Sequence, residues 1–160
     1  MTRSVWRIAT DTPDYEAHNL SGAGARRTGG RWNSPGEPLV YASETPALAC
    51  LETMVHLNAA GLPLKRYLVE ITVPDDIWRA GEVHDPASLP VGWDAQPAGR
   101  ASLAFGAAWG AAMRSLILLV PSTIVPEERN VLVNTLHPDC ARLAARKIRK
   151  WLYDPRLVPH

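Results

Sequence analysis

Residues 29–52 read GGRWNSPGEPLVYASETPALACLE, and this stretch decides the local fold of the chain. The short apolar segments 31–33 and 38–43 are typical of two strands around a turn, because proline and glycine stand between them. Thr45 is a typical helix N-cap, and the proline that follows it suits the first helical position. The stretch therefore predicts strand, turn, strand and then a helix.

The rest of the chain predicts further short strands and two more helices. Gly61 and Pro63 are expected to end the helix that begins at Thr45. Strands are expected at 5–10, 65–73, 76–80, 116–120 and 130–134, loops at 19–30 and 81–99, and helices at 100–115 and 139–151. The continuous apolar run LILLV predicts a central strand. Short strands mixed with three helices, without an internal repeat or a long linker, indicate one compact α+β domain over 1–160.

Composition excludes several classes of protein. The 160 residues carry a formal net charge of +1 and are 46% hydrophobic, as in an ordinary globular domain. The first residues lack the apolar core of a signal peptide, and Arg114 and Ser115 interrupt the most apolar region, so we expect no membrane span. Cys50 and Cys140 lie too far apart for a Cys-x-x-Cys motif, which favours a reduced, cytoplasmic setting.

Glu52 is the first candidate site residue. At about 100° per residue it lies roughly 40° from Leu48, at the border of the apolar stripe of its helix. A carboxylate at that border is partly desolvated, and this is unfavourable unless a partner compensates. Two interpretations remain open, an ion pair with an arginine and a site carboxylate.

Three other side chains have both a structural and a functional interpretation. Arg31 lies among glycines, where its guanidinium either is solvated or binds a phosphate or carboxylate through two parallel bonds. Tyr41 ends an apolar strand and is either a core tyrosine or a cavity wall. Ser122 follows the apolar strand at 116–120, where serine is either ordinary turn chemistry or a site residue.

Other kinds of catalytic site find no support in the sequence. The five histidines form neither H-x-x-x-H nor H-E-x-x-H, so we expect no metal site. GARRTGGR lacks the Lys-Ser/Thr ending of a P-loop, and no Gly-x-Ser-x-Gly elbow occurs. A basic cluster at 142–150 indicates a solvated face or, in the alternative, a non-enzymatic basic module that binds nucleic acid or an acidic protein.

Taken together, these residues resemble the RES domain family, named for an arginine, a glutamate and a serine. GGRWN supplies Arg31, ACLETMVH supplies Glu52, and LVPSTIVPEERNVLVN supplies Ser122 and Asn134. W-R near the start and LVYAS before the helix also fit. The chain departs from the family at Thr135, where proline is common.

The resemblance implies a specific function. RES proteins are similar to ADP-ribosyltransferases in fold and are toxins of bacterial toxin–antitoxin pairs that consume NAD. For this chain it implies Glu52 and Arg31 as catalytic residues, with Arg31, Tyr41, Ser122 and Asn134 around NAD and no metal. It also implies an Xre-like helix-turn-helix antitoxin as partner, transfer of ADP-ribose to a host protein, water or phosphate, and no direct role for nucleic acid.

Overall fold

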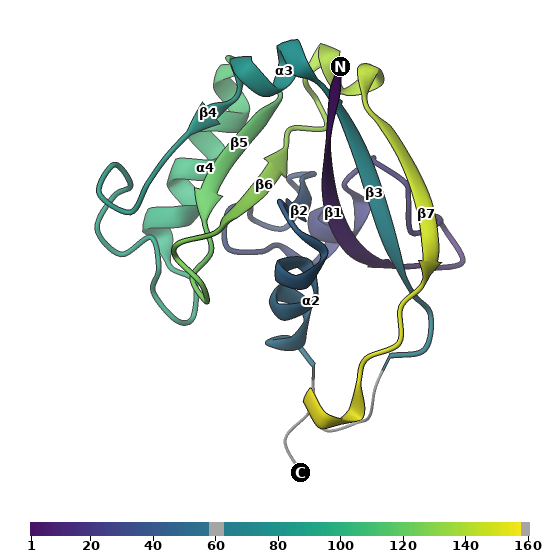
Figure 1. Cartoon of the computed structure of the whole chain (residues 1–160). Helices are drawn as coiled ribbons and strands as arrows, with labels where there is room; N and C mark the ends of the chain where they lie inside the picture. Colours follow the sequence, from purple (N-terminus) through teal and green to yellow (C-terminus); the bar gives the residue numbers. More distant parts are fainter. Residues whose placement is uncertain (58–62, 158–160) are drawn as a thin grey trace.

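One mixed sheet organises the chain in the computed structural model, which describes residues 1–57 and 63–157 (Figure 1). Its seven strands run in the order β4-β5-β6-β2-β1-β3-β7. The strands are β1 (Thr2–Thr10), β2 (Val40–Ser43), β3 (Arg66–Pro74), β4 (Glu82–Val83), β5 (Ile117–Pro121), β6 (Arg129–Val133) and β7 (Ala144–Lys150). The helices are α1 (Ala23–Thr28), α2 (Pro46–Met54), α3 (Asp75–Ala80) and α4 (Arg100–Ala112), with 3-10 turns η1 (Pro138–Arg142) and η2 (Pro155–Leu157).

The sheet opens between β1 and β2. These neighbours share a single registered pair, Trp6 with Ser43, whereas β1 and β3 pair along their whole length from Thr2 with Pro74 to Thr10 with Arg66. The strands β4, β5 and β6 with α4 therefore form one half of the molecule and β1, β3 and β7 the other (Figure 1). Helix α2 lies at the junction below β2.

Apolar residues on both sides hold this junction together. The buried Ala49 and Cys50 of α2 pack in one cluster with Ile8 of β1 and Leu68 of β3. A second cluster joins β5 and β6 to three tryptophans outside the sheet, Trp32, Trp93 and Trp109. Helix α2 begins as predicted, because Thr45 Oγ1 accepts a bond from the Leu48 amide at 3.1 Å and Pro46 is the first helical residue.

The α+β prediction is confirmed, as are the strands near 5–10, 65–73, 116–120 and 130–134 and the helix from 100. Residues 1–57 and 63–157 contain four α-helices where the sequence predicted three. Helix α2 ends at Met54, and its predicted end at Gly61 lies outside the described residues. Among the helices that the structure describes, none combines the length and the apolar character that a membrane crossing requires.

Five local predictions are wrong. Residues 139–151 form η1 and strand β7 in place of a helix, because pairing with β3 overrides the helical spacing of their apolar residues. Residues 76–80 are helical, since two aspartates in the first turn favour a helix start. Residues 31–33 are not a strand, the expected loop at 19–30 contains α1, and the expected loop at 81–99 contains β4. The run at 116–120 is an interior strand as predicted, because β4 and β6 pair with its two sides.

Helix α4 approaches the chain at Trp32 through a glycine. A Cβ on Gly106 would lie 1.9 Å from the Trp32 carbonyl oxygen, while one on Gly110 of the same helix would meet nothing within 4 Å. The two glycines therefore have opposite roles, one required for packing and one only weakening the helix.

We predict that Gly106→Ala lowers the free energy of unfolding by about 1–3 kcal/mol, because α4 must move away from Trp32. Gly110→Ala is the matched control and should raise it by about 0.5–1 kcal/mol through helix propensity. Urea denaturation of both variants measures the difference. Equal effects of the two changes would contradict the close packing at Trp32.

Candidate functional site

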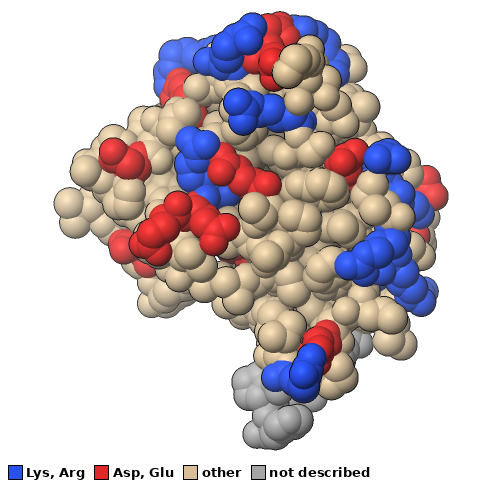
Figure 2. Space-filling model, in the orientation of Figure 1, with Lys and Arg blue, Asp and Glu red and all other residues tan. Residues whose placement is uncertain are grey.

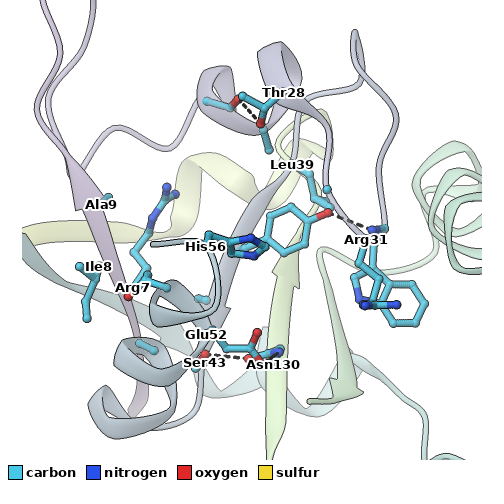
Figure 3. A pocket seen from close by; sticks show the side chains of 18 of the residues that line it. Arg7, Ile8, Ala9, Thr28, Arg31, Leu39, Ser43, Glu52, His56 and Asn130 are labelled. Atoms are coloured by element: carbon cyan, nitrogen blue, oxygen red, sulfur yellow. Dashed lines mark hydrogen bonds between the residues drawn. The ribbon is translucent and has the colours of Figure 1, made fainter. Parts of the chain in front are cut away.

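A cavity of about 1120 Å³ lies where the sheet opens between β1 and β2. Its wall is formed by β1, β2, α1, α2 and the loops beside them. Figure 3 shows Arg7 on one side of this space and Arg31 on the other, with Glu52 and Asn130 between them. Elements far apart in sequence thus bring two cations and one carboxylate to a shared space.

Helix α2 presents Glu52 to the cavity while its buried face holds Leu48, Ala49 and Cys50. Glu52 Oε1 accepts two hydrogen bonds, one from Ser122 Oγ at 2.6 Å and one from Asn130 Nδ2 at 2.7 Å. Asn130 Oδ1 in turn accepts from Ser43 Oγ at 2.7 Å, which fixes the orientation of the amide. No donor to Oε2 occurs in the ranges that the structure describes, so this oxygen remains available to a ligand.

Ser122 supports the carboxylate and does not line the cavity. Its side chain is fully buried after the end of β5, and its Oγ also accepts from the amides of Ile124 at 3.0 Å and Val125 at 3.1 Å. One hydroxyl therefore satisfies a turn and orients Glu52. The predicted contact of Ser122 with a ligand is replaced by this indirect position.

Tyr41 lines the cavity from β2, and its hydroxyl is fixed. It accepts from the Trp32 amide at 3.0 Å and donates to Asn33 Oδ1 at 2.6 Å. Burial raises the pKa of Tyr41 to about 12, so the phenol stays protonated at neutral pH. A Cβ at position 30 would lie 2.5 Å from this hydroxyl, which explains the glycine before Arg31.

Arg31 joins the cavity to the loop that follows β4. Its Nη1 donates to the carbonyls of Trp93 at 3.0 Å and Ala95 at 2.8 Å. Burial lowers the pKa of Arg31, while the nearby charges of Glu52 and Asp94 oppose this shift. The arginine therefore fixes the backbone that leads into Gln96, Pro97 and Ala98, three residues of the cavity wall.

Arg7 is a site residue that the sequence analysis missed. It lies in β1, lines the cavity, and its buried Nε has no hydrogen-bond partner within the described ranges. Burial lowers its pKa to about 10, so it remains a cation at neutral pH. The available signal was an arginine in the middle of an otherwise apolar strand, VWRIA.

Asn134 does not reach this cavity. Its Nδ2 donates to the Gly110 carbonyl at 3.0 Å, and it lines a separate cavity of about 300 Å³ beside α4. Asn130, four residues earlier, contacts Glu52 in its place. A strand rises roughly 3.3 Å per residue, so Asn130 near the start of β6 and Asn134 just after its end lie about 13 Å apart. The sequence analysis named Asn134 and not Asn130, and a role of Asn134 in ligand binding stays a prediction.

Comparison with known proteins identifies the family. The description "RES domain" belongs to the family that matches residues 4–155. The chain belongs to the RES domain family. The resemblance predicted from GGRWN, ACLETMVH and the LVPS segment is thereby confirmed.

Three relatives of this RES domain are informative. A protein of Sphingobium sp. (strain YBL2) named "Prs ADP-ribosylating toxin" is 62% identical over 99% of this chain and 98% of its own length. A "Toxin Res" of Pseudomonas putida is 36% identical over 96% of this chain and 98% of its own. A "Toxin Res" of Yersinia enterocolitica is 34% identical over 89% of this chain and 93% of its own length.

Metal ligands do not gather in the described part of this RES domain. Within residues 1–57 and 63–157, no group of three histidine, cysteine or acidic side chains is close enough to hold an ion. His56 lines the cavity one helical turn after Glu52, and it has no such companions. That the domain needs no metal remains a prediction.

We predict that Ser122→Ala destabilises this RES domain by about 1–3 kcal/mol, because two amides and an oxygen of the half-buried Glu52 carboxylate lose a partner. Ser34→Ala is the control, since no bond of the Ser34 hydroxyl occurs among the described residues. Thermal unfolding of both variants tests this. If the Ser122→Ala protein were as stable as the Ser34→Ala protein, the hydrogen bonds of the Ser122 hydroxyl would not contribute to the stability of the domain.

Proposed function

We propose that this RES domain is a toxin that cleaves the nicotinamide–ribose bond of NAD and transfers the ADP-ribose to a protein. The observation that carries the proposal is Glu52, a carboxylate held through one oxygen inside a cavity with an arginine on either side. The name of the Sphingobium relative supports ADP-ribosylation, and the "Toxin Res" relatives support a toxin.

The reaction needs one well-placed carboxylate. When the bond between ribose C1′ and the nicotinamide nitrogen breaks, its electron pair moves to the pyridinium ring, and neutral nicotinamide leaves without a proton. This removes the need for the general acid that a glycosidase pair supplies. Positive charge then develops on the ribose, and Glu52 stabilises it electrostatically. Its Oε2 accepts a bond from a ribose hydroxyl, while Ser122 and Asn130 keep Oε1 in place.

The two arginines bind the negatively charged part of NAD in this proposal. Arg7 contributes a guanidinium that lines the cavity, and a guanidinium binds phosphate oxygens through charge-assisted hydrogen bonds. Arg31 uses Nη1 for the loop, and its remaining nitrogens face the ligand. Tyr41 packs against the nicotinamide or the ribose. Of the predicted ligand contacts, Arg31 and Tyr41 are retained, and Asn130 is added.

The acceptor completes the reaction. A nucleophile of the acceptor forms the new bond to C1′ and loses its proton to solvent. Because the relative that is 62% identical is named for Prs, we propose a Prs protein as the acceptor, with water and phosphate as the competing acceptors. We further propose that the domain acts in the bacterial cytoplasm and that an Xre-like helix-turn-helix antitoxin is its partner.

The experiment incubates the purified chain with NAD and a bacterial Prs protein and follows nicotinamide release together with the mass of Prs. We expect one or more ADP-ribose additions on Prs. Glu52→Gln keeps the shape but removes the charge, so turnover should fall on the order of a hundredfold, roughly 3 kcal/mol. NAD affinity should change far less, because full positive charge on the ribose exists only near the transition state.

The outcomes separate the two interpretations of Glu52. If it were only half of a structural ion pair, the Gln variant would lose thermal stability and keep its activity per folded molecule. Nicotinamide release without modification of Prs would support the cleavage of NAD but exclude Prs as the acceptor. Absence of NAD cleavage by the wild-type chain would contradict the whole proposal.

A further prediction concerns Arg7. Arg7→Gln should weaken NAD binding by roughly tenfold to a hundredfold, because hydrogen bonds to charged groups contribute about 1.5–3 kcal/mol. Arg3→Gln is the control, since Arg3 lies on the same strand over the Trp78 ring and is exposed. Calorimetric titration with NAD measures both affinities. An Arg7→Gln variant that binds NAD as the Arg3→Gln variant does would place the diphosphate elsewhere.

A further inference from the structure

The basic segment at 145–150, ARKIRK, has no part in the proposed NAD chemistry. It lies on β7, the last strand in the order of the sheet, and β3 pairs with one side of it. No strand in the described ranges pairs with the other side. Such an edge presents unpaired backbone N–H and C=O groups to which an extended peptide can add.

The two edges of the sheet differ in length. The opposite edge, β4, has two residues, whereas β7 has seven. A two-residue edge offers too few backbone groups to select a partner, whereas β7 has the length of an ordinary strand, with a bulge at Ile148 where the register to β3 shifts. Only β7 is therefore long enough to hold an added strand.

The basic side chains of β7 are not equally free. Arg146 Nε lies 3.2 Å from Glu70 Oε1, and Lys147 Nζ lies 3.1 Å from Asp11 Oδ2. Arg149 and Lys150 have no carboxylate partner in the described part of the chain, and the Arg149 guanidinium lies 4.6 Å from the centre of the Trp151 ring. Figure 2 shows lysine and arginine gathered on the side where Figure 1 places β7.

These charges decide between the possible occupants. Two copies of β7 paired edge to edge would bring like charges together, which destabilises a β ladder. Nucleic acid is a poor match, because Arg146 and Lys147 are already compensated and the chain has a net charge of only +1. An extended acidic segment matches both the free backbone and the uncompensated cations. The exposed Ile148, directly before Arg149, adds a place for an apolar side chain.

We propose that β7 is a docking edge to which a partner protein adds an extended acidic segment as a further strand, with Arg149 and Lys150 as its charge contacts. This inference does not depend on the NAD chemistry. It does place the partner beside the cavity. Arg66, the first residue of β3, lines the cavity, and its carbonyl accepts the Trp151 amide at 2.8 Å directly after β7.

The test uses the full chain labelled with ¹⁵N and the peptide acetyl-EVTVEVTVE-amide as the probe. Amide shifts and hydrogen exchange report where it binds. We expect shifts and slowed exchange centred on β7, and no binding of the same peptide with lysine in place of glutamate. Arg149→Glu with Lys150→Glu should lower the affinity for the acidic peptide by about tenfold or more, because the attraction is lost and repulsion is added.

A matched variant controls for net charge. Arg79→Glu with Arg100→Glu changes the charge equally at two exposed residues outside β7 and should leave the affinity near wild type. Arg149→Gln with Lys150→Gln gives a milder second test if the reversal disturbs folding.

Four results would overturn the proposal. They are no binding of the acidic peptide, binding away from β7, protection of β7 in a concentration-dependent dimer without peptide, and tighter binding of a short single-stranded DNA than of the peptide at β7. If the acidic peptide did not bind, the basic residues of β7 would instead protect this edge against edge-to-edge aggregation.

Discussion

The sparse pairing of β1 with β2 is the constraint on which the rest of the structure depends. One registered pair, Trp6 with Ser43, keeps the sheet continuous, and beyond it the two strands separate. A fully paired sheet would have its strands about 4.8 Å apart and leave no room for a ligand between them. The opening supplies the cavity, and α2 closes its lower end with apolar residues on one face and Glu52 beside them.

The hydrogen-bond network at the opening explains why a carboxylate is tolerated there. Ser43, Asn130 and Ser122 come from β2, β6 and the turn after β5, and together they satisfy one oxygen of Glu52. Buried polar groups are tolerated when their bonds are made, and a connected network holds each member in one orientation. The network joins α2 to β2, β6 and the turn after β5, so the position of the carboxylate and the docking of the helix are set by the same contacts.

Local signals in the sequence predicted the start of α2 and the position of Glu52. They failed where pairing between strands that are distant in sequence determines the structure. The start of α2 followed from Thr45 and Pro46 alone, and the border position of Glu52 followed from helical spacing. Residues 139–151 could not be assigned this way, since only pairing with β3 makes 144–150 a strand. Arg7 and Asn130 were missed for the same reason. The arginine within VWRIA is a weak local signal and Asn130 has none, and the register of β1, β2 and β6 brings both residues to the cavity.

The order in which the site residues occur along the chain has a consequence for synthesis on the ribosome. Glu52 is made early, but Ser122 and Asn130, which hold it, come 70 and 78 residues later, and β7 is added after them. Domains fold as their segments emerge. A nascent chain that ends before Asn130 thus carries Glu52 without the bonds that orient it. The topology itself delays the bonds that orient Glu52 until β6 has been made.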